Sequence, residues 1–160
     1  MSCLVIGYGN TLCGDDGLGP MVAQHLETLL SPQQKQDISV ITLLQLDLIL
    51  ANRLKDYSEI IFIDAQMGLY QEDVMVEEVG PWLGLRTKPP ASGFSGHFLS
   101  PRDLLQVTEE LYKTRPRAWI VAVRGYRMEI GEGLSSEAQA NIEKGTRAVR
   151  ELLDQTLPLV

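Results

Sequence analysis

The chain contains 160 residues, of which 44% are hydrophobic and 22% are charged, and this composition is that of an ordinary soluble globular domain. It excludes a disordered chain, a collagen-like repeat and a coiled coil, and the length predicts one domain over residues 1–160. The formal net charge at pH 7 is -7 and the sequence pI is near 4.8. Nucleic acid and anionic membrane surfaces are therefore disfavoured as partners, because both are negatively charged.

Targeting and redox signals predict a cytoplasmic protein. The first residues carry no basic leader and reach Gly7 after a very short apolar run, so we expect no signal peptide. No apolar stretch approaches the roughly 20 residues that a helix needs to cross a bilayer. Without an export signal, Cys3 and Cys13 are expected to be reduced thiols. Cys3 is interpreted as a small apolar strand residue, whereas Cys13 lies in a loop beside two carboxylates, where a reactive role stays open.

Strand and helix patterns alternate along the first half of the chain. An apolar run at 4–6 that ends in the turn 7–10 predicts a buried first strand. Apolar residues at helical spacing predict a helix from about Gly19 to Leu30, with Pro20 in its first turn. The next predicted elements are a strand at 39–43, a short helix at 46–54 and a central strand at 60–64.

The second half continues the alternation. Apolar and acidic side chains alternate at 73–79, as expected of a half-exposed edge strand. Residues 84–97 contain two prolines and three glycines and are interpreted as a mobile loop. The remaining predicted elements are a helix capped by Ser100, a last strand at 119–123 and a C-terminal helix capped at 135–137. Five strands alternating with helices predict an α/β domain with a mainly parallel sheet.

Three polar features follow strand ends or lie in the irregular loop, and functional sites gather at the carboxyl ends of such sheets. They are the adjacent pair Asp15 and Asp16, then Asp64, and then His97. One aspartate of the pair is expected to cap the helix that begins near Leu18, which leaves the other free to face the end of the sheet. If Asp16 and Asp64 converge, their repulsion requires a proton or a cation.

Two carboxylates and one imidazole are a suitable ligand set for a divalent transition ion. A pair of aspartates, Asp16 and Asp64, that activates water is an alternative chemistry for the same residues. A thiol–imidazole pair of Cys13 with His97 lacks any local signature. The other histidine, His25, lies inside the first predicted helix and is interpreted as a surface or boundary residue.

Several common motifs are absent or broken. The third glycine of the dinucleotide-binding pattern GxGxxG would fall on Leu12, and Asp15 and Asp16 would repel a bound phosphate. The sequence also contains no phosphate-binding P-loop, no HExxH, no GxSxG and no CxxC.

Three segments together resemble the hydrogenase maturation proteases. The pattern Val5-Ile6-Gly7-x-Gly9-Asn10-x-Leu12-x-x-Asp15-Asp16-Gly17-x-Gly19 is similar to the N-terminal signature of that family. The resemblance continues in Phe62-Ile63-Asp64-Ala65 and in Ser95-Gly96-His97-Phe98-x-Ser100-Pro101, and it spans nearly the whole chain. The first pattern is fairly specific, whereas the other two gain weight only from their order.

The resemblance implies a twisted α/β sheet with helices on both faces. It implies an endopeptidase, aspartic in type, that removes the C-terminal extension of a [NiFe] hydrogenase large-subunit precursor after nickel insertion. In the family, two carboxylates and one histidine recognise nickel already held by the substrate, and carried over to this chain these are Asp16, Asp64 and His97. Nickel would thus arrive with the precursor rather than stay with the free enzyme.

The chain departs from the family pattern after the second predicted strand. Many relatives carry an Asp-Gly-Gly-Thr-like motif there, whereas this chain has Leu43-Leu44-Gln45-Leu46-Asp47. This stretch is closer to the branch that serves bidirectional, NAD-linked hydrogenases, and Gln45-Leu46 is interpreted as a substrate-selecting segment. Two other functions use the same residues: a nickel-dependent checkpoint or chaperone that binds the precursor without cutting it, and an autonomous metallohydrolase.

Overall fold

The computed structural model describes residues 2–80 and 99–157 and shows an α/β fold. The strands are β1 (Cys3–Tyr8), β2 (Ile38–Leu43), β3 (Glu59–Gln66), β4 (Val74–Val79) and β5 (Arg117–Arg124). The α-helices are α1 (Leu18–Leu29), α2 (Gln34–Asp37), α3 (Ala51–Leu54), α4 (Pro101–Tyr112) and α5 (Ser136–Thr156). Two 3₁₀ turns, η1 (Gly14–Gly17) and η2 (Leu48–Leu50), precede α1 and α3. The predicted fold class and the order of the strands along the chain are confirmed.

The five strands form one sheet in the order β2-β1-β3-β5-β4. All neighbours are parallel except β4, which pairs antiparallel with β5 at one edge. The exposed middle of β4 agrees with its prediction as an edge strand. In contrast, β1 and β3 are almost completely buried, which explains why their sequences are continuous apolar runs rather than alternating patterns.

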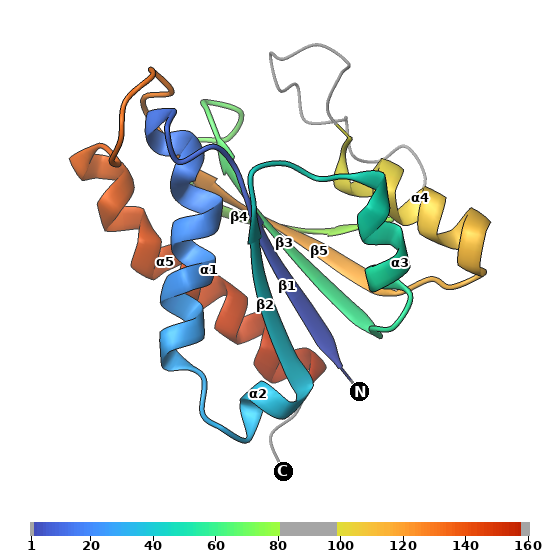
Figure 1. Ribbon diagram of the computed structural model, residues 1–160. Helices are drawn as coiled ribbons and strands as arrows, with labels where there is room; N and C mark the ends of the chain where they lie inside the picture. The colour runs from blue at the N-terminus through green and yellow to red at the C-terminus, as the bar shows by residue number, and fades with distance from the viewer. Residues whose placement is uncertain (1, 81–98, 158–160) are drawn as a thin grey trace.

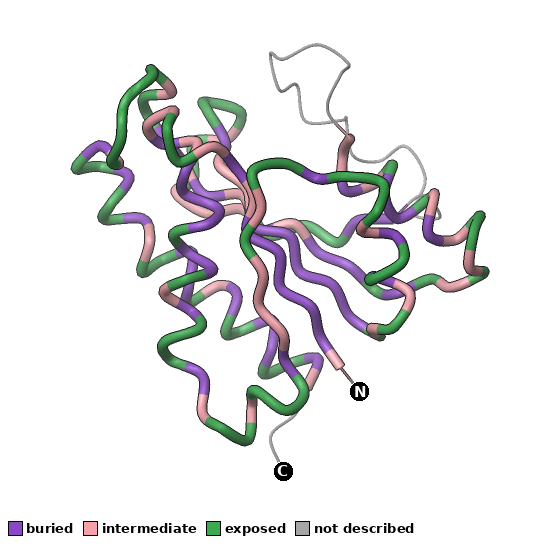
Figure 2. The backbone as a smooth tube through the Cα atoms, in the orientation of Figure 1, coloured by how far each residue is buried: buried purple, intermediate pink, exposed green. Residues whose placement is uncertain are grey.

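Helices cover both faces of the sheet, as expected from the resemblance (Figure 1). Helices α1 and α5 pack on one face with Val5 and Ile63, and α3 and α4 pack on the other with Ile6 and Phe62. Successive side chains of a strand point to opposite faces, so each central strand contributes to both cores. The central strands β1 and β3 are almost entirely buried in Figure 2.

Two predicted helix caps are present. The Ser100 hydroxyl accepts a hydrogen bond from the Asp103 N–H, and the Asp103 carboxylate accepts one from the Ser100 N–H, so α4 begins with a reciprocal capping box. The Ser135 hydroxyl accepts a hydrogen bond from the Ala138 N–H and caps α5. The predicted short helix at 46–54 is instead η2 followed by the single turn of α3. None of the helices in the described ranges is long and apolar enough to cross a membrane.

The start of α1 rests directly on the ends of the central strands. A Cβ added to Gly19 would lie 2.3 Å from the Tyr8 carbonyl oxygen and 2.5 Å from the Ile63 carbonyl oxygen. A side chain at this position would therefore force the helix away from β1 and β3. Because α1 follows the loop after β1, this close contact also fixes that loop over the carboxyl ends of β1 and β3.

We predict that Gly19→Ala lowers the free energy of unfolding by about 3 kcal/mol, because rigid backbone atoms must move to accept the new methyl group. Gln24→Ala, at an exposed position of the same helix, is the matched control and is expected to change stability by less than about 0.5 kcal/mol. Chemical denaturation measures both. Equal unfolding midpoints for the two variants would contradict the close packing of α1 on the sheet.

Candidate functional site

The candidate site lies at the carboxyl edge of the sheet, where the chain leaves neighbouring strands in opposite directions. From β1 the chain passes to α1 on one face, whereas from β3 it passes through β4 to α4 on the other face. Since β1 and β3 are adjacent, the connections that follow them diverge to opposite faces of the sheet, and sites in parallel α/β sheets gather at such points. Asp16 follows β1 and Asp64 lies near the end of β3, so both predicted carboxylates lie beside this point.

Asp64 is held by a tyrosine from the neighbouring strand. The register of β1 with β3 pairs Gly7 with Ile63, and one step further it places Tyr8 beside Asp64 on the face that α3 and α4 cover. The Tyr8 hydroxyl donates a hydrogen bond to Asp64 Oδ2 over 2.9 Å, and both residues are half-buried. The signature discussed above leaves position 8 unspecified, so sequence reasoning did not identify this contact.

Burial raises the pKa of Asp64 from its usual 3.8 to about 7. The Tyr8 hydroxyl and the Ala65 N–H both lower this pKa, but repulsion from the Asp16 carboxylate raises it further. The same surroundings, burial first and then the Asp64 charge, raise the pKa of Tyr8 well above its usual value. Near neutral pH, Asp64 is therefore present in both its protonated and its ionised form, while Tyr8 keeps its proton.

Asp16 lies in η1, close enough for its charge to act on both Asp64 and Tyr8. Its Oδ2 accepts a hydrogen bond of 2.7 Å from the Asn10 N–H, so the loop after β1 fixes its orientation. Gly9, at φ 147°, allows this tight turn, since a Cβ there would lie 1.9 Å from the Asp16 carbonyl oxygen. The structure thus brings the two predicted carboxylates to one place, while their functional role stays a prediction.

Asp15 does not cap α1, although we expected one of the two aspartates to do so. Helix α1 begins after Gly17 without a side-chain cap, so the prediction that Asp15 or Asp16 caps it is wrong. Asp15 is fully buried and accepts hydrogen bonds of 2.7 to 2.9 Å from the N–H groups of Tyr126, Arg127 and Ser135 and from the Ser135 hydroxyl. It therefore supports the start of α5, through Ser135, rather than the start of α1.

Burial alone would raise the pKa of Asp15, but the hydrogen bonds from Ser135, Tyr126 and Arg127 outweigh burial and lower that pKa below its usual value. The main chain also joins the loop after β1 to the loop after β5. The Asp15 N–H donates to the Arg127 carbonyl, and Cys13 forms a bridge with Gly131. The half-exposed Cys13 is a free thiol in this bridge, and Cys3 is a free thiol buried in the core.

The third predicted site residue, His97, lies outside the described residues, as do the irregular segment 84–97 and positions 95–98 of the third resembling pattern. Within residues 2–80 and 99–157, no group of three histidine, cysteine or acidic side chains is placed to hold a metal ion. The proposed ligand set of Asp16, Asp64 and His97 therefore remains a prediction. His25 is half-buried in α1, in agreement with its interpretation as a boundary residue.

In the segment that departs from the family pattern, two residues have a structural role. Leu46 is only 6% exposed and packs in the core beneath α3 and α4, which leaves Gln45 as the exposed member of the predicted substrate-selecting pair. The Asp47 carboxylate accepts a hydrogen bond of 2.9 Å from the Ile49 N–H and caps η2. Asp47 thus has a local structural role in this chain.

Exposed apolar side chains surround the carboxyl edge, and the sequence patterns did not single them out. They come from the loops that follow β1, β2, β3 and β5, and they are Leu12, Leu44, Leu48, Ile49, Met67, Leu69, Tyr126 and Ile130. Ile130 is 93% exposed and Ile49 is 80% exposed, values unusual for large apolar side chains. Exposed apolar residues gathered in this way are typical of a surface that binds another polypeptide.

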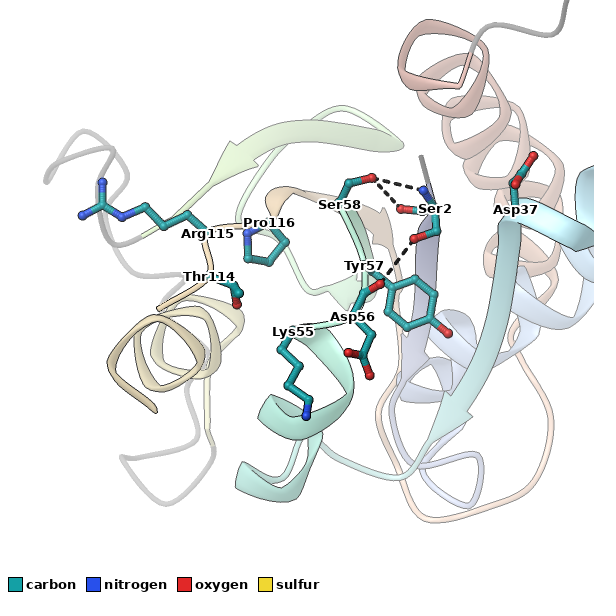
Figure 3. Close-up of a pocket in the computed structure, with 9 residues that line it drawn as sticks. All are labelled: Ser2, Asp37, Lys55, Asp56, Tyr57, Ser58, Thr114, Arg115 and Pro116. Atoms are coloured by element: carbon teal, nitrogen blue, oxygen red, sulfur yellow. Dashed lines mark hydrogen bonds between the residues drawn. The ribbon is translucent and has the colours of Figure 1, made fainter. Parts of the chain in front are cut away.

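A depression lined by described residues lies at the opposite edge of the sheet. It measures about 580 Å³ and is formed by segments that precede the strands, including Ser2, Asp56 and Ser58 (Figure 3). The Ser58 hydroxyl and the Ser2 main chain hydrogen-bond to one another across it. It is open to solvent and lies far along the sheet from Asp16 and Asp64, so it takes no part in the candidate site.

We predict that Asp15→Ala lowers the free energy of unfolding by about 3 kcal/mol, because it leaves buried N–H donors of three residues without an acceptor. Since folding lowers the pKa of Asp15, its contribution is present above the unfolded-state pKa and is lost as the pH falls through the folded-state pKa. Denaturation at pH 7 and at about pH 3 measures this contribution. Asp154→Asn, at an exposed position of α5, is the control; equal stability of both variants at pH 7 would contradict the role of Asp15.

Asp64 has the opposite pH dependence. Its folded-state pKa of about 7 lies above the usual 3.8, so its contribution to stability is complete below the unfolded-state pKa and is lost as the pH rises to about 7. We predict that Asp64→Asn is more stable than the wild type at pH 8 and that this advantage is smaller at pH 4. Denaturant midpoints at the two pH values measure the difference, again with Asp154→Asn as the control. If the stability of Asp64→Asn changed with pH in parallel with that of the wild type, the ionisation of Asp64 would not cost the fold any stability.

Comparison with known proteins identifies the fold. No protein-family model matches the chain, and no curated protein sequence matches it. Among solved structures, the hydrogenase maturating endopeptidase HybD from E. coli is 20% identical, with a TM-score of 0.75 and coverage of 98% of this chain and 94% of that one. An endopeptidase from Escherichia coli is 21% identical, with a TM-score of 0.78 and the same coverages.

A third similar structure comes from an archaeon. The [NiFe] hydrogenase maturation protease HybD from Thermococcus kodakarensis is 20% identical, with a TM-score of 0.66 and coverage of 95% of this chain and 99% of that one. The similarity extends over nearly the full length of each protein, and it agrees with the resemblance inferred from the sequence. The chain therefore has the fold of the hydrogenase maturation endopeptidases.

Proposed function

We propose that this chain is an endopeptidase that removes the C-terminal extension from the nickel-loaded large-subunit precursor of a [NiFe] hydrogenase. The observation that carries the proposal is the pairing of Asp16 and Asp64 at the carboxyl edge of a fold shared with proteins named hydrogenase maturation endopeptidases. The sequence resemblance, which includes both aspartates, points to the same activity. The cytoplasm is the proposed compartment, as the sequence led us to expect.

In this proposal, nickel belongs to the substrate. The precursor presents the ion, and Asp16, Asp64 and His97 complete its coordination, because carboxylate and imidazole are ligands that divalent transition ions accept. The bound ion polarises the scissile carbonyl or lowers the pKa of the attacking water, or it serves only as an anchor that places the peptide bond beside the carboxylates. Each version requires the two aspartates to face the same point beyond the carboxyl ends of β1 and β3.

Asp64 is suited to proton transfer. A general base works best when its pKa lies near the operating pH, and the pKa of Asp64 is raised to about 7 by burial and by the Asp16 charge. In the version in which nickel serves only as an anchor and Asp64 is not bound to the ion, Asp64 takes a proton from the attacking water as the water oxygen bonds to the carbonyl carbon. It then returns a proton to the departing amine as the peptide bond breaks. This chemistry is aspartic in type, with Asp16 as the charge that tunes its partner.

The surroundings of the two aspartates favour a polypeptide substrate. Exposed apolar side chains such as Leu12, Ile49 and Ile130 rise from separate loops around the carboxyl edge. A small polar substrate would not require such a surface, whereas a folded precursor with an extended C-terminal segment would bury it. These residues support a proposal in which a pair of acids performs the chemistry and exposed apolar side chains contact the precursor.

The first test incubates a purified hydrogenase large-subunit precursor with this protein, with and without nickel, and follows the precursor by mass spectrometry. We expect a defined C-terminal peptide to be lost from the nickel-loaded precursor alone. Binding without any change in mass would replace the proposal with a checkpoint or chaperone. Cleavage regardless of nickel, or one metal ion retained per purified protein molecule, would replace it with an autonomous metallohydrolase.

We predict that Asp16→Asn, Asp64→Asn and His97→Ala each reduce the rate of precursor cleavage by about 100-fold or more, the usual contribution of a catalytic acid or base. The two asparagine variants should remain folded, since each amide retains an oxygen that can accept the existing hydrogen bond. Circular dichroism and the cleavage rate are measured together, with Asp154→Asn as the control. Wild-type rates for Asp16→Asn and Asp64→Asn would exclude the proposed site.

A further inference from the structure

We propose that Tyr8 is a positioning residue that holds the Asp64 carboxylate in its reactive orientation. This inference rests on the proposed function, because it assigns a partner to one of the two aspartates of that site. The contact involved is the hydrogen bond of 2.9 Å from the Tyr8 hydroxyl to Asp64 Oδ2. Position 8 is the unspecified residue between Gly7 and Gly9 in the N-terminal pattern, so the sequence resemblance assigns it no role.

The contact is built into the sheet. The parallel register joins each residue of β1 to the residue 56 positions later in β3, and the hydrogen bond joins two residues with the same separation. Both side chains therefore project to one face from neighbouring positions on adjacent strands. No loop has to adopt a particular conformation for the tyrosine to reach the carboxylate.

The main chain around Tyr8 is restrained on three sides. Tyr8 pairs with Leu43 of β2, the Gly9 N–H donates to the Leu43 carbonyl over 3.0 Å, and Gly19 of α1 lies against the Tyr8 carbonyl. The ring packs against the core formed with α3 and α4. These contacts leave the Tyr8 hydroxyl little freedom to move.

The main chain of Asp64 is also restrained, because Asp64 pairs with Ala122 of β5. Its carboxylate nevertheless needs a restraint, because the nearby charge of Asp16 repels it. Without the tyrosine hydroxyl, this repulsion would favour rotamers that turn Asp64 away from Asp16. The Ala65 N–H also stabilises the Asp64 charge, but it belongs to the adjacent residue, whereas the Tyr8 hydroxyl holds Oδ2 from the neighbouring strand.

Tyr8→Phe tests this role because it removes the hydroxyl and retains the packed ring. Tyr57→Phe is the matched control: the Tyr57 hydroxyl also makes a partly buried hydrogen bond, of 3.1 Å to the Ser39 hydroxyl, but at the other end of the sheet. We expect Tyr8→Phe to lower kcat for the nickel-loaded precursor by about 10-fold, as is usual for residues that orient a reactive group, with KM unchanged within about twofold. Tyr57→Phe should keep wild-type kinetics.

Three outcomes of the kinetic test would overturn the inference. They are a wild-type kcat in Tyr8→Phe, an equal loss of kcat in Tyr57→Phe, and a loss that appears entirely in KM. The last outcome would mean that Tyr8 contacts the precursor itself. If the wild-type protein does not cleave the precursor, the proposed function fails, and the inference is then judged from the free protein.

Side-chain coupling constants provide that independent measurement. In the free wild-type protein at pH 8, the Asp64 Hα–Hβ couplings measured by NMR should correspond to a single χ1 rotamer. In Tyr8→Phe they should approach averaged values, and in Tyr57→Phe they should equal those of the wild type. Unaveraged couplings in Tyr8→Phe would show that Asp64 is oriented without the tyrosine and would overturn the inference whatever the enzyme's activity.

Discussion

The buried carboxylate of Asp15 is the interaction on which the carboxyl edge depends. It accepts hydrogen bonds from three main-chain N–H groups and one hydroxyl, and these donors belong to the loop after β5 and to the start of α5. Asp15 itself belongs to the loop after β1. One fully buried charge thus joins the loop after β1 to a loop and a helix that lie more than a hundred residues further along the chain. Asp16 lies in the same 3₁₀ turn, where the Asn10 N–H holds its carboxylate.

The three aspartates of this edge show how surroundings give one residue type different properties. The Asp15 side chain is not exposed to solvent, yet its pKa is lowered, because four donors satisfy its charge. Asp64 receives one side-chain hydrogen bond and lies near another carboxylate, so burial dominates and its pKa rises to about 7. At Asp15 the hydrogen bonds outweigh burial, whereas at Asp64 burial outweighs the hydrogen bonds, so the two carboxylates have pKa values shifted in opposite directions.

Much of this arrangement could be predicted from the sequence because it depends on local patterns. The apolar runs of β1 and β3, the Ser100 and Ser135 caps and the edge position of β4 follow from the spacing of residues and were predicted correctly. The meeting of Asp16 with Asp64 was also foreseeable, since parallel strands place their carboxyl ends together. The role of Asp15 was not predictable, because its donors lie more than a hundred residues away and carry no side-chain signature.

The contact between Tyr8 and Asp64 belongs to the same class of non-local features. It depends on the register of β1 with β3, and a shift of one residue would turn Tyr8 to the opposite face. That register is determined by the two cores, because Leu4 and Ile6 must point to α3 and α4 while Cys3 and Val5 point to α1 and α5. The apolar residues of β1 therefore set the geometry of the candidate site, although none of them takes part in its chemistry. A polar substitution within this strand should impair the site through its geometry, even where the two aspartates are unchanged.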